Sequence, residues 1–338
     1  MLFGLDSPLA APPAIMSGQR PRTDPTDPLL WRFGCNIPLL GSLVWCSNGK
    51  HSLAPHPREA SLPPRYFRSP ASGLLVHHRS WVPTGKPRAV IYVLHGLFEH
   101  IERYTHVGEA WAQAGFAVHG LDHQGHGQSE GDPGYFASFD GMVADALHLM
   151  REAAPAPVGV PRFLFGHSMG GLLALHTARA APPGFFKGLL LCAPALVADP
   201  KTDNAFNRFM AGLLGSTLPK LEVAPLAKTH LCSDKAVVAQ YERDPLVFHG
   251  KLRARVGAEF IKAMPAALAL APALDLPLLI VHGEDDKLCD ISGSRQLLAA
   301  YTHRDKELKP FPGLQHELHN EKGMPSVFFI TAWVEKHI

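Results

Sequence analysis

Cysteine is scarce in this chain, and the few cysteines are not paired by spacing. Only five occur among 338 residues. They are scattered, and none belongs to a Cys-x-x-Cys motif: Cys35, Cys46, Cys192, Cys232 and Cys289. An odd, dispersed set argues against a disulfide framework and against a cysteine-ligated zinc site. We therefore expect a reducing compartment and a cytoplasmic location.

The chain also lacks an excess of charge of one sign and a long apolar run. Its 32 basic and 30 acidic residues leave a net charge of +2, so no strong field favours a nucleic-acid partner. The longest apolar stretches are expected to fall short of the roughly 20 residues that a membrane span needs. The first ten residues lack the basic segment and apolar run of a signal peptide. With 46% hydrophobic residues, the chain has the composition of a globular protein with a buried core.

Residues 1–60 differ from the rest of the chain. They are rich in proline and show no sustained hydrophobic period, which predicts an extended or disordered leader. The apolar segment 37–45 within it has two interpretations. It packs on the following domain, which we favour, or it acts in targeting or membrane contact. A plastid transit role would call for an Arg-rich amphipathic helix, which is not evident.

Regular alternation of strands and helices begins near residue 65 and defines the fold class. The pattern predicts strands at 66–67, 74–82, 89–94, 116–121, 162–165, 187–192, 276–281 and 306–311, of which 89–94 is a continuous apolar, β-branched run. Helical patterns lie at 102–114, 139–153, 170–181, 292–301 and 326–336. This alternation predicts an α/β domain over 61–338, with a doubly wound, mostly parallel sheet. The alternation stops over about 195–271, where short helices and loops without a convincing strand predict a helical cap insertion.

The motif Gly-His-Ser-Met-Gly at 166–170 supplies a candidate nucleophile. It follows a predicted strand and precedes a predicted helix, the context in which a tight turn exposes a serine at the sheet edge. Ser168 is therefore the expected nucleophile. The Met169 backbone N–H, at the positive end of the helix, is expected to form half of an oxyanion hole. The alternative is an ordinary strand–helix turn, which has no need of a serine between two glycines.

An acid and a base follow in the order that this arrangement requires, serine first, then acid, then histidine. Asp286 lies in the loop after the strand 276–281 and is the expected acid, with Asp285 as second choice. Asp290 has the position of a helix N-cap. His316 lies in the loop after the strand 306–311 and is the expected general base, with His319 as the rival. The set predicts a serine hydrolase of the α/β-hydrolase fold, whose mechanism needs no metal or cofactor.

Further histidines surround the predicted strand ends. His95-Gly96-Leu97 follows the strand 89–94, where the second oxyanion donor of this fold is found, so the Leu97 N–H is the candidate. His119, His123 and His126 suggest metal spacing, but no cysteine or carboxylate set completes a site. His316-Glu-Leu-His319 does not match the H-E-x-x-H motif of zinc proteases.

Several segments together resemble the monoacylglycerol lipase family, which includes related lysophospholipases. They are 95–104 (HGLFEHIERY), 122–131 (DHQGHGQSEG), 166–171 (GHSMGG), 286–290 (DKLCD), 313–319 (GLQHELH) and, in the cap, 241–246 (YERDPL). The resemblance implies hydrolysis of a long-chain monoacylglycerol to glycerol and fatty acid. It places Glu99, Arg103, Tyr241 and His319 around the glycerol end and Cys289 near the site. The bulky pair Leu97-Phe98 departs from the small residues usual in this loop, which predicts a narrower site.

The predicted cap carries an apolar stripe whose members recur at helical spacing: Phe206, Phe209, Met210, Leu213 and Leu214. It either packs on the sheet domain or forms an acyl channel wall with peripheral membrane contact. For the function, three readings remain open: a lipid ester hydrolase, a hydrolase of another acyl group such as a lysophospholipid or a caffeoyl ester, and a non-catalytic binder.

Overall fold

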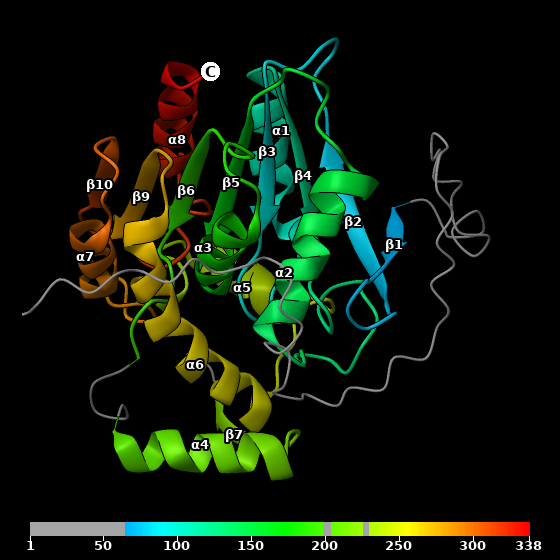
Figure 1. Ribbon diagram of the computed structural model, residues 1–338, viewed down its shortest axis with the longest axis vertical. Coiled ribbons are helices and arrows are strands. Elements are labelled where there is room, and N and C mark those ends of the chain that lie inside the picture. The colour runs from blue at the N-terminus through cyan, green and yellow to red at the C-terminus, as the bar shows by residue number, and fades with distance from the viewer. Residues whose placement is uncertain (1–64, 199–203, 226–229) are drawn as a thin grey trace, which may run out of the picture. The chain divides into compact units, whose positions relative to one another are not determined.

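The computed structural model describes residues 65–198, 204–225 and 230–338 and contains an eight-stranded sheet (Figure 1). Its strand order is β1-β2-β4-β3-β5-β6-β9-β10. The bounds are β1 Tyr66–Arg68, β2 Leu75–Trp81, β3 Ala89–Leu94, β4 Phe116–Leu121, β5 Arg162–His167, β6 Gly188–Cys192, β9 Leu278–Gly283 and β10 Lys306–Phe311. The leader predicted over 1–60 lies outside the described residues.

Parallel pairing dominates the sheet. Within this sheet, the six neighbouring strands β4, β3, β5, β6, β9 and β10 pair in parallel. Only the pairs β1 with β2 and β2 with β4 are antiparallel. Every residue of β3, β6 and β9 is buried, because helices cover both faces of a parallel sheet. The predicted doubly wound, mostly parallel α/β fold is therefore confirmed.

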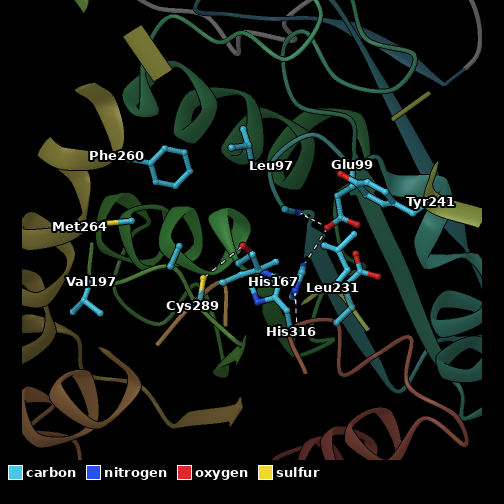
Figure 2. A pocket seen from close by; sticks show the side chains of 15 residues that line it. Leu97, Glu99, His167, Val197, Leu231, Tyr241, Phe260, Met264, Cys289 and His316 are labelled. Atoms are coloured by element: carbon cyan, nitrogen blue, oxygen red, sulfur yellow. Dashed lines mark hydrogen bonds and ion pairs between the residues drawn. The ribbon is translucent and has the colours of Figure 1, made fainter. Parts of the chain in front are cut away.

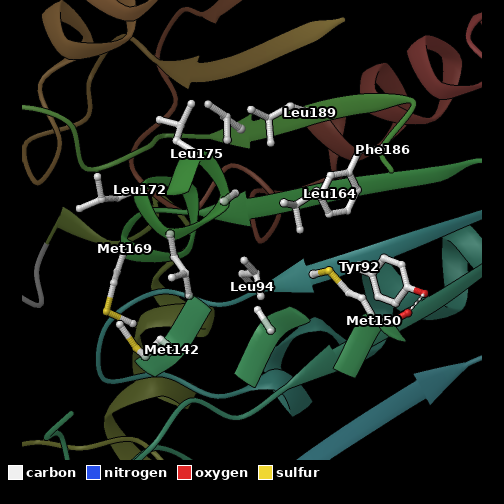
Figure 3. Packing of buried hydrophobic residues seen from close by; sticks show 14 of the residues in the cluster. Tyr92, Leu94, Met142, Met150, Leu164, Met169, Leu172, Leu175, Phe186 and Leu189 are labelled. Atoms are coloured by element: carbon white, nitrogen blue, oxygen red, sulfur yellow. Dashed lines mark hydrogen bonds between the residues drawn. The ribbon is translucent and has the colours of Figure 1, made fainter. Parts of the chain in front are cut away.

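Two apolar layers hold the helices onto the sheet. On one face pack α2 Phe139–His148, α3 Met169–Ala180 and α7 Ile291–Ala300, through a cluster that Figure 3 shows around Leu164, Leu172 and Met142. On the other face pack α1 Thr105–Gln113 and α8 Pro325–Lys336, where Trp111 and Trp333 are buried. The helix predicted over 102–114 is divided into a 3₁₀ turn at Ile101–Tyr104 and α1.

The insertion between β6 and β9 corrects part of the sequence prediction. It contains α4 Ala205–Thr217, α5 Lys235–Arg243 and α6 Ala254–Leu270. No strand was predicted there, but β7 Glu222–Pro225 and β8 Lys251–Arg253 form an antiparallel ribbon. Both strands are short and contain no buried residue, so they lack the apolar alternation that marks a strand in sequence. The helices were predicted to be short, but α6 has 17 residues and continues through Pro265.

Helix α6 also corrects the expectation about apolar length. With the 3₁₀ turn that follows it, the stretch Ala254–Ala273 has 20 residues, and an 18-residue window within it has a mean hydropathy of 1.3, enough by length and composition to cross a membrane. In this structure it packs between α3 and α4. Its buried Glu259 accepts a hydrogen bond from the Phe139 N–H at 3.0 Å, which ties the helix to the start of α2.

Candidate active site

Ser168 lies at the turn between β5 and α3, as the sequence predicts. Its backbone has φ 55° and ψ −117°, a region that L-residues rarely adopt, and such strain is typical of functional sites. The flanking glycines are required by close backbone approach. A Cβ on Gly166 would collide with the Gly170 carbonyl, and a Cβ on Gly170 would collide with the Leu94 carbonyl. The turn therefore presents the serine at the carboxyl edge of the sheet.

Among the three acids considered for the loop after β9, Asp286 is the one that contacts His316. The His316 Nδ1 lies 2.7 Å from the Asp286 Oδ2, and both side chains are buried. The other Asp286 oxygen accepts the backbone N–H groups of Leu288 and Cys289 at 2.8 and 3.0 Å. Asp285 is exposed, and Asp290 caps α7 through the Ser292 N–H, as predicted.

The electrostatic surroundings keep Asp286 ionised. Burial raises its pKa, but the nearby His316 and the hydrogen bonds from His282 and His316 outweigh burial, so the pKa lies well below its ordinary value. An ionised carboxylate only accepts hydrogen bonds, so the His316 Nδ1 must be the donor. The His316 Nε2 is then left with a lone pair that can take a proton.

Ser168 and His316 line the same cavity, which has a volume of about 170 Å³ (Figure 2). The Ser168 hydroxyl lies 3.9 Å from the Cys289 thiol. Burial, with the charge of Asp286, raises the pKa of Cys289, so the thiol stays protonated beside the serine. The resemblance in sequence placed Cys289 near the site, and the structure places it in the cavity wall.

The loop after β3 approaches the serine closely. A Cβ on Gly96 would lie 3.3 Å from the Ser168 Cβ, so a side chain there would crowd the nucleophile. The Gly96 N–H donates to the Glu99 carboxylate at 2.6 Å. The N–H groups of Leu97 and Met169 donate to no acceptor in the described parts of the chain. These two backbone donors are thus left for a ligand.

The four residues expected at the glycerol end are divided between the cavity wall and a layer behind it. Glu99 and Tyr241 line the cavity, and Figure 2 shows both on one side of it. Arg103 and His319 do not line it. The Arg103 guanidinium lies 4.8 Å from the Tyr241 ring centre, and the His319 ring stacks on Tyr104 at 4.6 Å.

A buried ionic network supports this end of the cavity. Arg103 makes two hydrogen bonds of 2.7 Å to the Glu317 carboxylate and one of 2.6 Å to Glu99. Glu99 also accepts from the Tyr104 hydroxyl at 2.8 Å and lies 3.2 Å from the His167 Nδ1. Burial raises the pKa of Glu99, but His167 and Arg103 outweigh it and hold the pKa well below the ordinary value.

Sequence reasoning missed two members of this network. His167 occupies the variable position before the serine, and Glu317 directly follows the predicted base. Both line the cavity. Only their positions next to Ser168 and His316 could have drawn attention to them, because their partners lie far away in the chain: Glu99 for His167 and Arg103 for Glu317.

The histidines weighed as metal ligands do not form one cluster. The His119 Nδ1 contacts the Ser80 hydroxyl, whereas His123 and His126 pack with His95. Burial lowers the pKa of His95 to about 3 and the pKa of His123 well below its ordinary value, so both rings are neutral. Among the described residues, the one group with metal-ligand spacing is a different one, His167, Cys192 and His319. Burial raises the pKa of Cys192 well above its ordinary value, which opposes the thiolate that a metal needs.

Comparison with known proteins agrees with this architecture. The family model described as serine aminopeptidase S33 matches residues 85–323. The human monoglyceride lipase is 36% identical over 269 residues, covering 79% of this chain and 88% of the relative. The monoacylglycerol lipase of Mycolicibacterium smegmatis is 35% identical, covering 79% and 95%.

Solved structures show the same fold. The monoacylglycerol lipase of Paleococcus ferrophilus superimposes with a TM-score of 0.70 at 28% identity, covering 78% of this chain and 99% of that one. A soluble variant of the Saccharomyces cerevisiae monoglyceride lipase, solved with a substrate analog, gives a TM-score of 0.71 at 23% identity, covering 84% and 99%. The chain belongs to the monoglyceride lipase family of α/β-hydrolases, which are carboxylic ester hydrolases.

Proposed function

We propose that this protein hydrolyses monoacylglycerols through an acyl-enzyme formed on Ser168. The observation that carries the proposal is a single cavity that contains Ser168 and His316, with the His316 ring held by Asp286 at 2.7 Å. The names of the relatives, monoglyceride and monoacylglycerol lipases, support this substrate class.

The mechanism follows from the proposed roles. His316 takes the Ser168 proton as the hydroxyl attacks the ester carbonyl, and Asp286 stabilises the imidazolium that forms. The N–H groups of Leu97 and Met169 hold the oxyanion of the tetrahedral intermediate. His316 then protonates the departing glycerol oxygen. Water, deprotonated by the same ring, releases the fatty acid.

The chemistry of the cavity wall favours an ester with one polar and one apolar end. Glu99 and Tyr241 offer hydrogen-bonding groups for glycerol hydroxyls. The opposite side is apolar, formed by Leu97, Phe260 and Met264. The same three residues border a second apolar cavity of about 260 Å³, which provides room for an acyl chain.

A fluorophosphonate probe tests the chemistry, and a substrate panel tests the specificity. Labelling is expected for the wild type and lost in Ser168→Ala, and a wild type that does not label would contradict the proposal and leave the non-catalytic reading. Monoacylglycerols of increasing chain length are then compared with lysophosphatidylcholine and caffeoyl esters. A higher kcat/KM for either of the latter two would replace the proposed substrate with a lysophospholipid or a phenolic ester.

For the apolar stripe of α4, we propose contact with a lipid surface. Its residues lie on two sides of the helix. Phe206, Phe209 and Leu213 are 70%, 66% and 45% exposed, whereas Met210 and Leu214 line a cavity together with residues of α6. A row of exposed large apolar side chains is costly in water and marks an interaction surface.

Liposome co-sedimentation tests this contact. The double variant Phe206→Ser/Phe209→Ser is expected to bind phosphatidylcholine vesicles several-fold more weakly than the wild type. The matched control is Phe328→Ser on α8, which removes a phenylalanine that is 63% exposed on another helix. Equal binding by all three proteins, or by none, would rule the contact out.

A further inference from the structure

Phe98, two residues after Gly96, has a backbone conformation that bulky residues avoid. Its φ is 69°, in the left-handed region, where the backbone of any residue other than glycine is strained. The residue is nevertheless buried, with 1% of its surface exposed. A strained backbone persists only where the surrounding structure holds it, so contacts of Phe98 must maintain this conformation.

The main contact comes from Phe248, in the insertion between α5 and β8. The two rings meet edge to face with centres 5.0 Å apart, and the Phe248 N–H donates to the Phe98 carbonyl at 2.9 Å. The side chain and the backbone of Phe98 are therefore both held by one residue that is 150 positions away in the chain.

Phe248 is itself fixed in place. A Cβ on Gly134 or on Gly250 would collide with its ring, so both glycines are needed for the ring to fit. The Arg253 guanidinium lies 5.5 Å from the ring centre, and Arg253 is the residue that precedes α6. The ring is thus held at the junction between the insertion and the sheet domain.

These contacts place the Leu97 N–H between two anchors. On one side the Gly96 N–H is bound by Glu99, and on the other Phe98 is bound by Phe248. We infer that Phe248 is a positioning residue for ester hydrolysis: it holds Phe98 in the left-handed conformation and thereby aims the Leu97 N–H at the oxyanion. This inference rests on the proposed function, in which that N–H stabilises the tetrahedral intermediate.

Two variants at position 98 separate the effect of the strained backbone from the loss of the ring. Phe98→Ala and Phe98→Gly both remove the ring, but only glycine adopts a positive φ without strain. With p-nitrophenyl acetate, whose acyl group is too short to need the apolar cavity, Phe98→Ala is expected to lose about tenfold to a hundredfold in kcat with KM nearly unchanged. Phe98→Gly is expected to retain more of the wild-type kcat than Phe98→Ala. Equal kcat values for the two variants would overturn the inference.

A rescue experiment covers the case in which Phe98→Ala does not fold. Phe248→Ala is expected to lower kcat by a similar factor, and Phe248→Ala/Phe98→Gly to recover a large part of it. A residue that only stabilised the insertion would give the opposite result, with the double variant worse than Phe248→Ala, and this outcome would also overturn the inference. All assays are run well below the melting temperature of each variant.

Ser168→Ala distinguishes a failure of the proposed hydrolysis from a failure of the role assigned to Phe248. If the wild type fails to hydrolyse the ester, or if Ser168→Ala hydrolyses it equally well, the proposed function itself is wrong. If the wild type is active, Ser168→Ala is inactive and Phe248→Ala keeps the wild-type kcat, only the role of Phe248 is wrong.

Discussion

His316 donates its Nδ1–H to the Asp286 carboxylate over 2.7 Å, although 30 residues separate them in the chain. The Asp286 Oδ2 also lies 3.3 Å from the His282 Nε2, and the His282 ring contacts the Ser294 hydroxyl and the Cys289 carbonyl. The carboxylate is thus held from several sides before any substrate arrives. Preorganisation of this kind fixes the tautomer of the proposed base.

Asp286→Asn should abolish most of the activity while leaving the fold intact. The amide keeps the size of the side chain but no longer selects the tautomer with a free Nε2, and in serine hydrolases such a change costs about 10⁴-fold in kcat. Steady-state kinetics with a monoacylglycerol checks this. The matched control is the exposed neighbour in Asp285→Asn, which should keep the wild-type kcat. A strong loss in the control with none in Asp286→Asn would assign the acid to Asp285.

Glu99→Gln should lower both the stability and the activity. The change leaves the buried Arg103 with one carboxylate instead of two and weakens the bond to the Gly96 N–H. Removing a buried charged acceptor costs about 3 kcal/mol in the free energy of unfolding. Denaturant unfolding measures this loss. Glu102→Gln is the control, because Glu102 is partly exposed and lies 3.6 Å from Arg79, a pair worth about 1 kcal/mol or less.

Leu97→Ala should change the preference for acyl length. The Leu97 side chain borders both the cavity that contains Ser168 and the apolar cavity of about 260 Å³, so it narrows the passage between them. Its truncation keeps the backbone N–H and widens the passage. The ratio of kcat/KM for a long-chain to that for a short-chain monoacylglycerol should rise several-fold. A ratio equal to that of the wild type would mean that the acyl chain takes another route.

Asp145→Asn should stabilise the protein at neutral pH. Burial raises the pKa of Asp145 to about 6, against a hydrogen bond from the Ser69 hydroxyl, which lowers it. The folded chain therefore binds this proton more tightly than the unfolded chain. The free energy of unfolding therefore falls as the pH rises from about 4, the ordinary pKa of aspartate, to about 6. Above pH 6 the destabilisation by the buried carboxylate reaches its full size.

The magnitude and the sign can both be measured for Asp145→Asn. A shift of about two pKa units corresponds to an upper limit of about 3 kcal/mol. Melting temperatures of the wild type and the variant should differ most at pH 8 and converge toward pH 4. A difference that grows as the pH falls would contradict the buried, proton-binding carboxyl.

The sheet could be predicted from sequence more completely than the insertion. The runs 89–94, 116–121 and 306–311 match β3, β4 and β10 in their bounds. For β3 and β4 the reason is that a continuous apolar run reports the burial of a strand directly. The ribbon of β7 and β8 was missed because its strands have only four and three residues and none of these residues is buried. The helices of the insertion were predicted to be short, but α6 has 17 residues and continues through Pro265.

Within the site, the positions of residues after strand ends predicted which of them lie at the same edge of the sheet. They did not predict which residues line the cavity and which lie behind its wall. Ser168, Asp286 and His316 follow strand ends, and parallel strands bring such ends to one edge of the sheet. The resemblance in sequence placed Arg103 and His319 around the glycerol end, but both lie behind the cavity wall. No local pattern encodes that difference, because it depends on packing against Tyr104, Tyr241 and Glu317.

Helix α6 both connects the insertion to the sheet and lines the cavity, and this limits how the insertion can be replaced by that of a homologue. Strands β6 and β9 are parallel neighbours, so the chain leaves the sheet at its carboxyl edge and must return to the opposite edge. Helix α6, which carries Phe260 and Met264, makes most of that return while also lining the cavity. A segment grafted from a homologue should therefore end before Ala254. The chimaera would then carry the foreign first part of the insertion and keep its own helix α6 as the connection to β9.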